Sequence, residues 1–246
     1  MGFRLLLSNT QNARVNMATD EALVKSFQEN DMPILRLYSW EKSFTIGVSQ
    51  NFSSYSHLIK QRNDYAKRIT GGGVLFHGHD VSYSLILPVS YMNDLNVKQS
   101  YEKICTFLLE FYRSLGLNAM YAKDDEKIHL SKSEFCQVGF EAYDILVNGI
   151  KIGGNAQRRT KKVIFQHGSI PIKNVSDEIL DNINTKKEIG FCLDEFDINL
   201  SYEQTQTLLI KAFEKTFKVS LQKSFLNEKE KETLSLLLKD KYDYAK

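Results

Sequence analysis

The spacing of hydrophobic and polar positions changes along the chain, and each spacing predicts a different element. Residues 15–30 carry apolar side chains at helical intervals, and Asn16 stands where a helix cap is expected. Residues 33–40 and 43–50 instead alternate apolar and polar side chains, which is typical of strands. The first fifty residues therefore predict a helix followed by two strands with a short turn between them.

Three consecutive glycines interrupt the pattern after these strands. Residues 67–70 and 73–77 flank the glycines and predict a hairpin, and residues 81–88 predict a further strand that ends at a proline. Residues 101–117 return to helical spacing, with Gly116 placed to end the helix.

Strands dominate again in the middle of the chain. Residues 143–149, 150–157 and 163–172 each predict a strand. The pair Asn148-Gly149 between the first two is a strong hairpin signal, because both residues tolerate the positive φ of a tight turn. The residues between the last two strands would form the tip of the next hairpin.

Toward the C-terminus the spacing becomes helical. Residues 202–217 and 227–242 predict amphipathic helices, and residues 219–222 predict a short strand between them. We therefore expect an α+β fold of mixed, largely antiparallel sheets flanked by helices. One domain would span residues 1–199, and residues 200–246 would form a helical segment packed on it.

Composition narrows the class of protein without naming a function. The chain has 246 residues, 42% hydrophobic and 25% charged, as expected for a globular protein of one or two domains. A net charge of +2 does not call for nucleic acid, and the three leucines near the N-terminus are too few for a signal peptide or a membrane span. We expect neither nucleic acid nor membrane as a partner.

Three cysteines, Cys105, Cys136 and Cys192, form an odd number at unrelated spacings. They match neither a zinc template nor a secreted disulfide framework, so a reducing cytoplasm is the expected location. Cys105 belongs to a predicted helix core, and acidic neighbours of Cys192 should raise its thiol pKa. By elimination, Cys136 is the candidate nucleophile, with an incidental small residue as the alternative.

The glycine run Gly71–Gly73 is costly in regular structure, at roughly 0.5–1 kcal/mol per glycine relative to alanine. Its surroundings match neither a Walker loop nor a dinucleotide-binding fingerprint. Two explanations stay open, an ordinary hairpin turn and a backbone that must approach a ligand closely.

A second segment with few bulky side chains follows Lys151. Gly153 and Gly154 stand there before small or amide-bearing residues. A lysine on a strand usually faces solvent. In a partly desolvated groove, however, its ammonium would polarise a carbonyl, stabilise an anion and favour a nearby thiolate.

Histidines and a basic run supply further candidates. His77 and His79 would share one face of a strand, but no third ligand has suitable spacing, so we expect no metal. His167, followed by Gly168, fits either a ligand contact or a structural hydrogen bond. The basic residues of 158–162 would be a solvated hairpin tip or an attractant for an acidic protein partner.

Five segments taken together resemble the lipoate–biotin protein ligase superfamily. They span Asn16 to Ile170 in the order and rough spacing of that family, and they read NMATDEAL, ILRLYSWEKSFTIGVSQN, KRITGGGVLFHGHDVSYSL, YDILVNGIKIGGNAQRR and QHGSI. The resemblance implies a catalytic domain with a mixed sheet flanked by helices, and it implies Lys151 and Cys136 as catalytic residues. The substrate-binding residues that it implies are Arg68, Gly71, Gly72, Gly73, Val74, Phe76, His77, Tyr83, Ser84, Gly153, Gly154, Asn155, Ala156, Gln157, His167 and Gly168.

The spacing of Cys136, seven residues before Tyr143, resembles the cysteine-dependent octanoyltransferases of this superfamily. That branch implies octanoyl transfer from acyl carrier protein, through a Cys136 thioester, to a lysine of a lipoyl-domain protein. The acceptor would be a protein such as the glycine-cleavage H protein or a dehydrogenase acyltransferase subunit. No cofactor would be required.

Two alternatives stay open. One is an ATP-dependent lipoate–protein ligase, which would use ATP and Mg to form a lipoyl-adenylate. The other is a non-catalytic acyl-binding relative.

Overall fold

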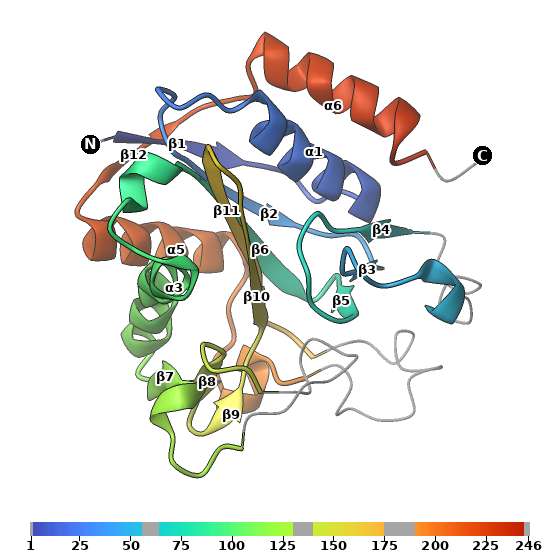
Figure 1. The fold of residues 1–246 in the computed structure, drawn as a ribbon. Coiled ribbons are helices and arrows are strands. Elements are labelled where there is room, and N and C mark those ends of the chain that lie inside the picture. The colour runs from blue at the N-terminus through green and yellow to red at the C-terminus, as the bar shows by residue number, and fades with distance from the viewer. Residues whose placement is uncertain (1, 56–63, 130–139, 175–189, 244–246) are drawn as a thin grey trace.

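A six-stranded mixed sheet forms the centre of the protein (Figure 1). The computed structural model describes residues 2–55, 64–129, 140–174 and 190–243. In spatial order the strands are β10 (Gly154–Arg159), β11 (Val163–Pro171), β6 (Asp80–Pro88), β2 (Ile34–Ser39), β1 (Gly2–Leu7) and β12 (Ser220–Lys223). The first four pair antiparallel, whereas β1 is parallel to both β2 and β12. The expected α+β class is therefore confirmed.

Helices cover both faces of this sheet, α1 with α6 on one side and α3 with α5 on the other (Figure 1). The long helices are α1 (Ala13–Ser26), α3 (Val97–Ser114), α5 (Tyr202–Phe217) and α6 (Glu228–Asp240). Short 3₁₀ turns are η1 (Phe52–Tyr55), η2 (Val89–Met92), η3 (Ala122–Asp124) and η5 (Leu193–Phe196). No helix among the described residues is long and apolar enough to cross a membrane.

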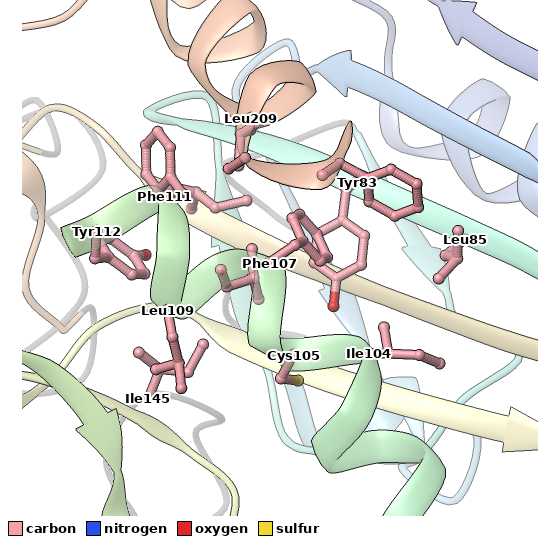
Figure 2. Packing of buried hydrophobic residues seen from close by; sticks show 14 of the residues in the cluster. Tyr83, Leu85, Ile104, Cys105, Phe107, Leu109, Phe111, Tyr112, Ile145 and Leu209 are labelled. Atoms are coloured by element: carbon pink, nitrogen blue, oxygen red, sulfur yellow. The ribbon is translucent and has the colours of Figure 1, made fainter. Parts of the chain in front are cut away.

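The main core lies between the sheet and the α3–α5 pair (Figure 2). Phe107 of α3 packs edge-on against Tyr83 of β6, with ring centroids 5.0 Å apart, and against Phe213 of α5 at 5.3 Å. Because side chains alternate across a strand, Leu35 and Leu37 of β2 join this core from the same face. The helix expected over residues 101–117 is confirmed as α3, which begins earlier, at Val97, and ends at Ser114.

Two small sheets flank the central one. In the first, β3 (Ser43–Ile46) lies between β4 (Tyr65–Lys67) and β5 (Leu75–His77). The hairpin expected from residues 67–70 and 73–77 is therefore wrong, because β3 occupies the place between the two segments.

The second small sheet contains β7 (Ala119–Tyr121), β8 (Ile145–Val147) and β9 (Ile150–Lys151). The β8–β9 hairpin is confirmed. Asn148 and Gly149 have φ of 50° and 79°, as a turn of type I′ requires.

The single strand expected over residues 150–157 is also wrong. It is divided into β9 and β10, which belong to different sheets. The chain breaks at Gly153, whose φ is 69° and where a Cβ would stand 2.2 Å from the carbonyl oxygen of Ser169. This glycine therefore redirects the chain from the small sheet into the central one.

Helix α1 begins earlier than its hydrophobic spacing suggested. Asn12, not Asn16, caps it, and the Asn12 side chain accepts a hydrogen bond from the Val15 amide at 2.9 Å. Asn16 is a buried residue inside the helix, where its Oδ1 accepts a hydrogen bond from the guanidinium of Arg36 at 2.7 Å.

The C-terminal segment supplies part of the central sheet as well as two helices. Strand β12 extends the sheet beside β1, and Arg4 of β1 forms an ion pair of 2.6 Å with Glu230 of α6. Residues 200–243 thus pack directly on the same sheet as the rest of the chain.

Candidate active site

A narrow pocket lies where α1, the β10–β11 pair and the small β4-β3-β5 sheet meet. Its volume is about 20 Å³, room for about one water molecule, and the pocket opens to solvent. The lining residues are Met17, Tyr38, Trp40, Arg68, Gly71, Leu75, His77, Ser82, Gly154, Asn155, Ala156, His167 and Gly168.

Arg68 holds the glycine loop in place. Its guanidinium donates to the carbonyl oxygens of Gly71 at 3.3 Å and Gly73 at 2.6 Å, and to Thr45 Oγ1 of β3 at 2.8 Å. The side chain is buried, so these three acceptors satisfy a charge that would otherwise be costly to desolvate. Arg68 therefore fixes the loop that forms one wall of the pocket.

The three glycines of this loop differ in what they require. Gly72 has a φ of 98°, which favours glycine. Its carbonyl oxygen would lie 2.1 Å from a Cβ on Gly47, so two bare backbones meet here. A Cβ on Gly71, by contrast, would meet nothing within 4 Å. The sequence left open what comes close to the glycine run. The structure shows that the backbone of Gly47 comes close to the backbone of Gly72.

His77 is fixed on three sides. Its ring stacks on Trp40 with centroids 3.7 Å apart, Nδ1 lies 3.0 Å from Asp80 Oδ2, and Nε2 lies 2.9 Å from Thr45 Oγ1. Burial alone would raise the pKa of Asp80, but the His77 ring and the hydroxyl of Ser169 outweigh it and lower the pKa to about 2.

Within the described ranges, no group of three or more ligating side chains could hold a metal ion.

His167 both lines the pocket and takes part in a buried hydrogen-bond network. Its Nε2 lies 2.7 Å from Thr70 Oγ1, next to the glycine loop, and its Nδ1 lies 3.7 Å from Asp20 Oδ2. Burial lowers the pKa of His167, although Asp20 opposes the shift. The contact with Thr70 connects β11 to the segment that leads into the glycine loop.

Asp20 is the centre of this network. Its carboxylate accepts from the guanidinium of Arg36 at 2.7 Å and from the Tyr38 hydroxyl at 3.0 Å. Sequence reasoning missed all three residues. A signal in the sequence could have found two of them. Asp20 is a charged residue on the apolar side of the predicted first helix, and Arg36 is a charged residue within an alternating strand. Both are buried in the structure.

Asn155 connects the pocket to the core. Its Oδ1 accepts from the Tyr83 hydroxyl at 2.9 Å, and its carbonyl oxygen accepts from the Tyr101 hydroxyl at 3.0 Å. Gly168 leaves the space for this amide, because a Cβ there would stand 2.0 Å from Asn155 Oδ1. Tyr83 and Gln157 thus act behind the wall of the pocket; Gln157 donates to Gln166 Oε1 at 3.0 Å.

Lys151 is buried, and its Nζ lies 2.6 Å from Asp144 Oδ2. Burial raises the pKa of Asp144 although Lys151 opposes the shift. In the described part of the chain, Lys151 is not among the lining residues of the pocket; it lies three residues before the lining Gly154 in the sequence.

The structure brings half of the expected substrate-binding residues to the pocket. Those that line it are Arg68, Gly71, His77, Gly154, Asn155, Ala156, His167 and Gly168. The other half do not line it, and they are Gly72, Gly73, Val74, Phe76, Tyr83, Ser84, Gly153 and Gln157. The proposed nucleophile Cys136 lies outside the described residues.

Five lining residues were not expected from the sequence. They are Met17, Tyr38, Trp40, Leu75 and Ser82. The sequence pattern assigns the apolar ones to a hydrophobic core, because spacing cannot separate a pocket-facing side chain from a core-facing one.

Comparisons with known proteins place this geometry in context. The family model described as Lipoyl protein ligase A/B catalytic domain matches residues 12–222. Octanoyltransferase LipM of Bacillus anthracis is 32% identical, over 93% of this chain and 91% of its own. Octanoyltransferase LipM of Kyrpidia tusciae is 30% identical, over 99% of each chain.

A solved structure shares the fold. Lipoate-protein ligase A, crystallised with ATP, superposes with a TM-score of 0.81 at 26% identity, over 98% of this chain and 96% of its own.

Proposed function

Since the chain belongs to the family of lipoyl protein ligase A/B catalytic domains, we propose that it is an octanoyltransferase. It moves an octanoyl group from acyl carrier protein to a lysine of a lipoyl-domain protein. The observation that carries this proposal is the likeness to octanoyltransferases LipM over more than nine tenths of the chain at 30–32% identity.

The chemistry proceeds in two displacements at a thiol. The Cys136 thiolate attacks the thioester carbonyl of the octanoyl carrier, the bond to the carrier sulfur breaks, and the carrier leaves as a thiolate. The acceptor lysine, as a free amine, then attacks the new thioester. An amide forms, Cys136 is released as a thiolate, and the proton lost by the amine passes through solvent to the carrier thiolate. The role of Cys136 rests on its spacing from Tyr143 in the sequence.

The ammonium of Lys151 would stabilise the oxyanion of each tetrahedral intermediate. Its ammonium is already desolvated and is held by Asp144 at 2.6 Å. A buried cation attracts a developing negative charge more strongly than an exposed cation does, because the dielectric constant around it is low.

The pocket is the place for the octanoyl chain, and it must widen to admit one. Met17 is the lining side chain best suited to move, because its three rotatable bonds let it refill irregular space. The glycine loop and β10, fixed by Arg68 and Tyr83, would keep their positions.

The proposal includes neither a nucleotide nor a metal, because a thioester donor is already activated for transfer. We also propose a reducing cytoplasm as the protein's location, because the three cysteines of the sequence match no secreted disulfide framework.

A second candidate is an ATP-dependent lipoate–protein ligase. The specific observation in its favour is the likeness to lipoate-protein ligase A bound with ATP. In that reaction the pocket would hold an acyl-adenylate, and Lys151 would contact its carbonyl.

One experiment separates the two. Purified protein is mixed with octanoyl-[acyl carrier protein] without ATP, and intact mass is followed for an octanoyl adduct before a lipoyl domain is added. We expect the adduct on the wild type and on the control C192A, and none on C136A. Absence of any adduct, together with lipoylation that requires ATP and lipoate, would establish the ligase instead.

A further inference from the structure

A second groove, separate from the pocket, has no role in the proposed chemistry. It runs between the C-terminal end of α1 and the turn of the β10–β11 hairpin, which lie next to each other in Figure 1. Its volume is about 450 Å³. We call it the basic groove, and its principal residues are the cations Lys25, Arg158, Lys161 and Lys162 around the apolar Val24, Phe27, Ile69 and Val163.

The charge of this groove is one-sided. Four of its lining side chains are cationic, and Glu21 is anionic. The Glu21 carboxylate is engaged by Lys241 at 2.6 Å, by the Tyr242 hydroxyl at 2.8 Å and by Lys25 at 3.1 Å. The net positive charge of the groove therefore comes mainly from Arg158, Lys161 and Lys162. Lys161 and Lys162 are exposed in the hairpin turn, so their charges face solvent over a partly apolar floor. Such a surface is complementary to an acidic protein face.

The groove and the pocket share one wall. Arg158 donates from its guanidinium to the carbonyl oxygen of Ile69 at 3.0 Å, and Ile69 stands two residues before the pocket-lining Gly71. Along β10, the groove-lining Arg158 lies two residues beyond the pocket-lining Ala156, about 7 Å at roughly 3.3 Å per residue. The two lysines follow in the turn beyond it.

This separation selects between the two protein partners of the proposed reaction. The acceptor must bring the end of a lysine side chain, a stem of only four carbons, to the acyl carbonyl, so it must dock at the mouth of the pocket. The donor carries its acyl group on a long, flexible prosthetic arm, so its protein surface can dock some distance away.

We propose that the basic groove docks an acidic face of the acyl carrier protein that delivers the octanoyl group. The inference rests on the proposed function and adds a donor-binding surface to it. Charge attraction at such a rim acts mainly on the association rate, and added salt screens it.

The test compares two donors with one acceptor lipoyl domain. We measure kcat and KM for octanoyl-[acyl carrier protein] and for S-octanoyl pantetheine, which lacks the protein, with wild type and the variant K161E/K162E. We expect the KM for the carrier to rise about tenfold at low salt and to approach the wild-type value at high salt. The constants for S-octanoyl pantetheine and for the acceptor should stay within twofold.

The matched control is K211E/K223E. It makes the same change of charge on exposed lysines of α5 and of β12, the strand at the opposite edge of the sheet from β10. It should leave every constant unchanged.

An unchanged carrier KM in K161E/K162E, an equal effect in the control, or an effect on the acceptor instead would each overturn the docking proposal. A wild-type protein that transfers octanoate from neither donor would refute the proposed function itself, which is a distinguishable result.

Discussion

Lys151 Nζ lies 2.6 Å from Asp144 Oδ2, with both side chains more than nine tenths buried. Asp144 Oδ2 also accepts a hydrogen bond from the Glu141 amide at 2.7 Å. The pair joins β9 to the segment just before β8, and the chain continues from β9 through Gly153 to the pocket-lining Gly154. Its geometry allows Asp144 to orient the ammonium that we propose as the oxyanion partner.

Removal of the carboxylate should therefore affect both stability and catalysis. In D144N a buried ammonium loses its counterion, and we expect a loss of about 3 kcal/mol in the free energy of unfolding. Denaturant unfolding measures this loss. We expect kcat to fall as well, because Lys151 is no longer oriented.

The double variant D144N/K151M is the control for this coupling. It removes both charges and should recover part of the lost stability without recovering activity. If D144N stayed within about 0.5 kcal/mol of the wild type, the pair would have no structural role.

The contact between Gly47 and Gly72 leads to a second prediction. In G47A the new methyl group would stand 2.1 Å from a backbone oxygen, so the glycine loop must shift. We expect a loss of about 1–3 kcal/mol and a higher KM for the donor. Thermal unfolding and steady-state kinetics check both effects.

G71A is the matched comparison, because its methyl group would meet nothing within 4 Å. Its stability should stay within about 0.5 kcal/mol of the wild type. Equal destabilisation of the two variants would contradict the distinction made between these glycines.

The lowered pKa of Asp80 leads to a prediction of how the free energy of unfolding depends on pH. Its pKa of about 2 lies below the ordinary value of 3.8, so the folded state favours the carboxylate. The contribution of the Asp80 carboxylate to the free energy of unfolding is fully present above about pH 5, and it is lost as the pH falls from there toward 2. The difference in pKa corresponds to about 2 kcal/mol.

Urea unfolding between pH 6 and pH 2 tests this dependence. The wild type should lose about 2 kcal/mol more than D80N over that range, because an amide does not titrate. Parallel curves for the two proteins would show that Asp80 does not carry the effect.

The reactivity of the cysteines is the fourth prediction. Burial raises the pKa of the Cys105 thiol far above its usual range and raises that of Cys192 to about 11. At pH 8 both thiols are protonated, so iodoacetamide should label neither in the folded protein. Peptide mass spectrometry would detect labelling, and modification of Cys105 without denaturant would contradict the assignment of its thiol to the core.

The elements of this fold could be predicted from local spacing, and their pairing could not. The helix over residues 101–117 and the turn at Asn148-Gly149 follow from interactions within a few residues, so the sequence shows them directly. The hairpin around the three glycines failed because β3, more than twenty residues upstream, pairs with both β4 and β5. No local pattern carries that information.

By itself, the sequence determined the periodic elements and the family resemblance. That resemblance pointed to Arg68, His77 and His167, which line the pocket. The tertiary structure decided that Met17 and Leu75 face a pocket and that Gly47 makes room for Gly72. It also decided that Asp20 and Arg36 form a buried pair under that pocket. The physical reason is that a side chain's chemistry is local, whereas what it faces depends on which distant segments pack against it.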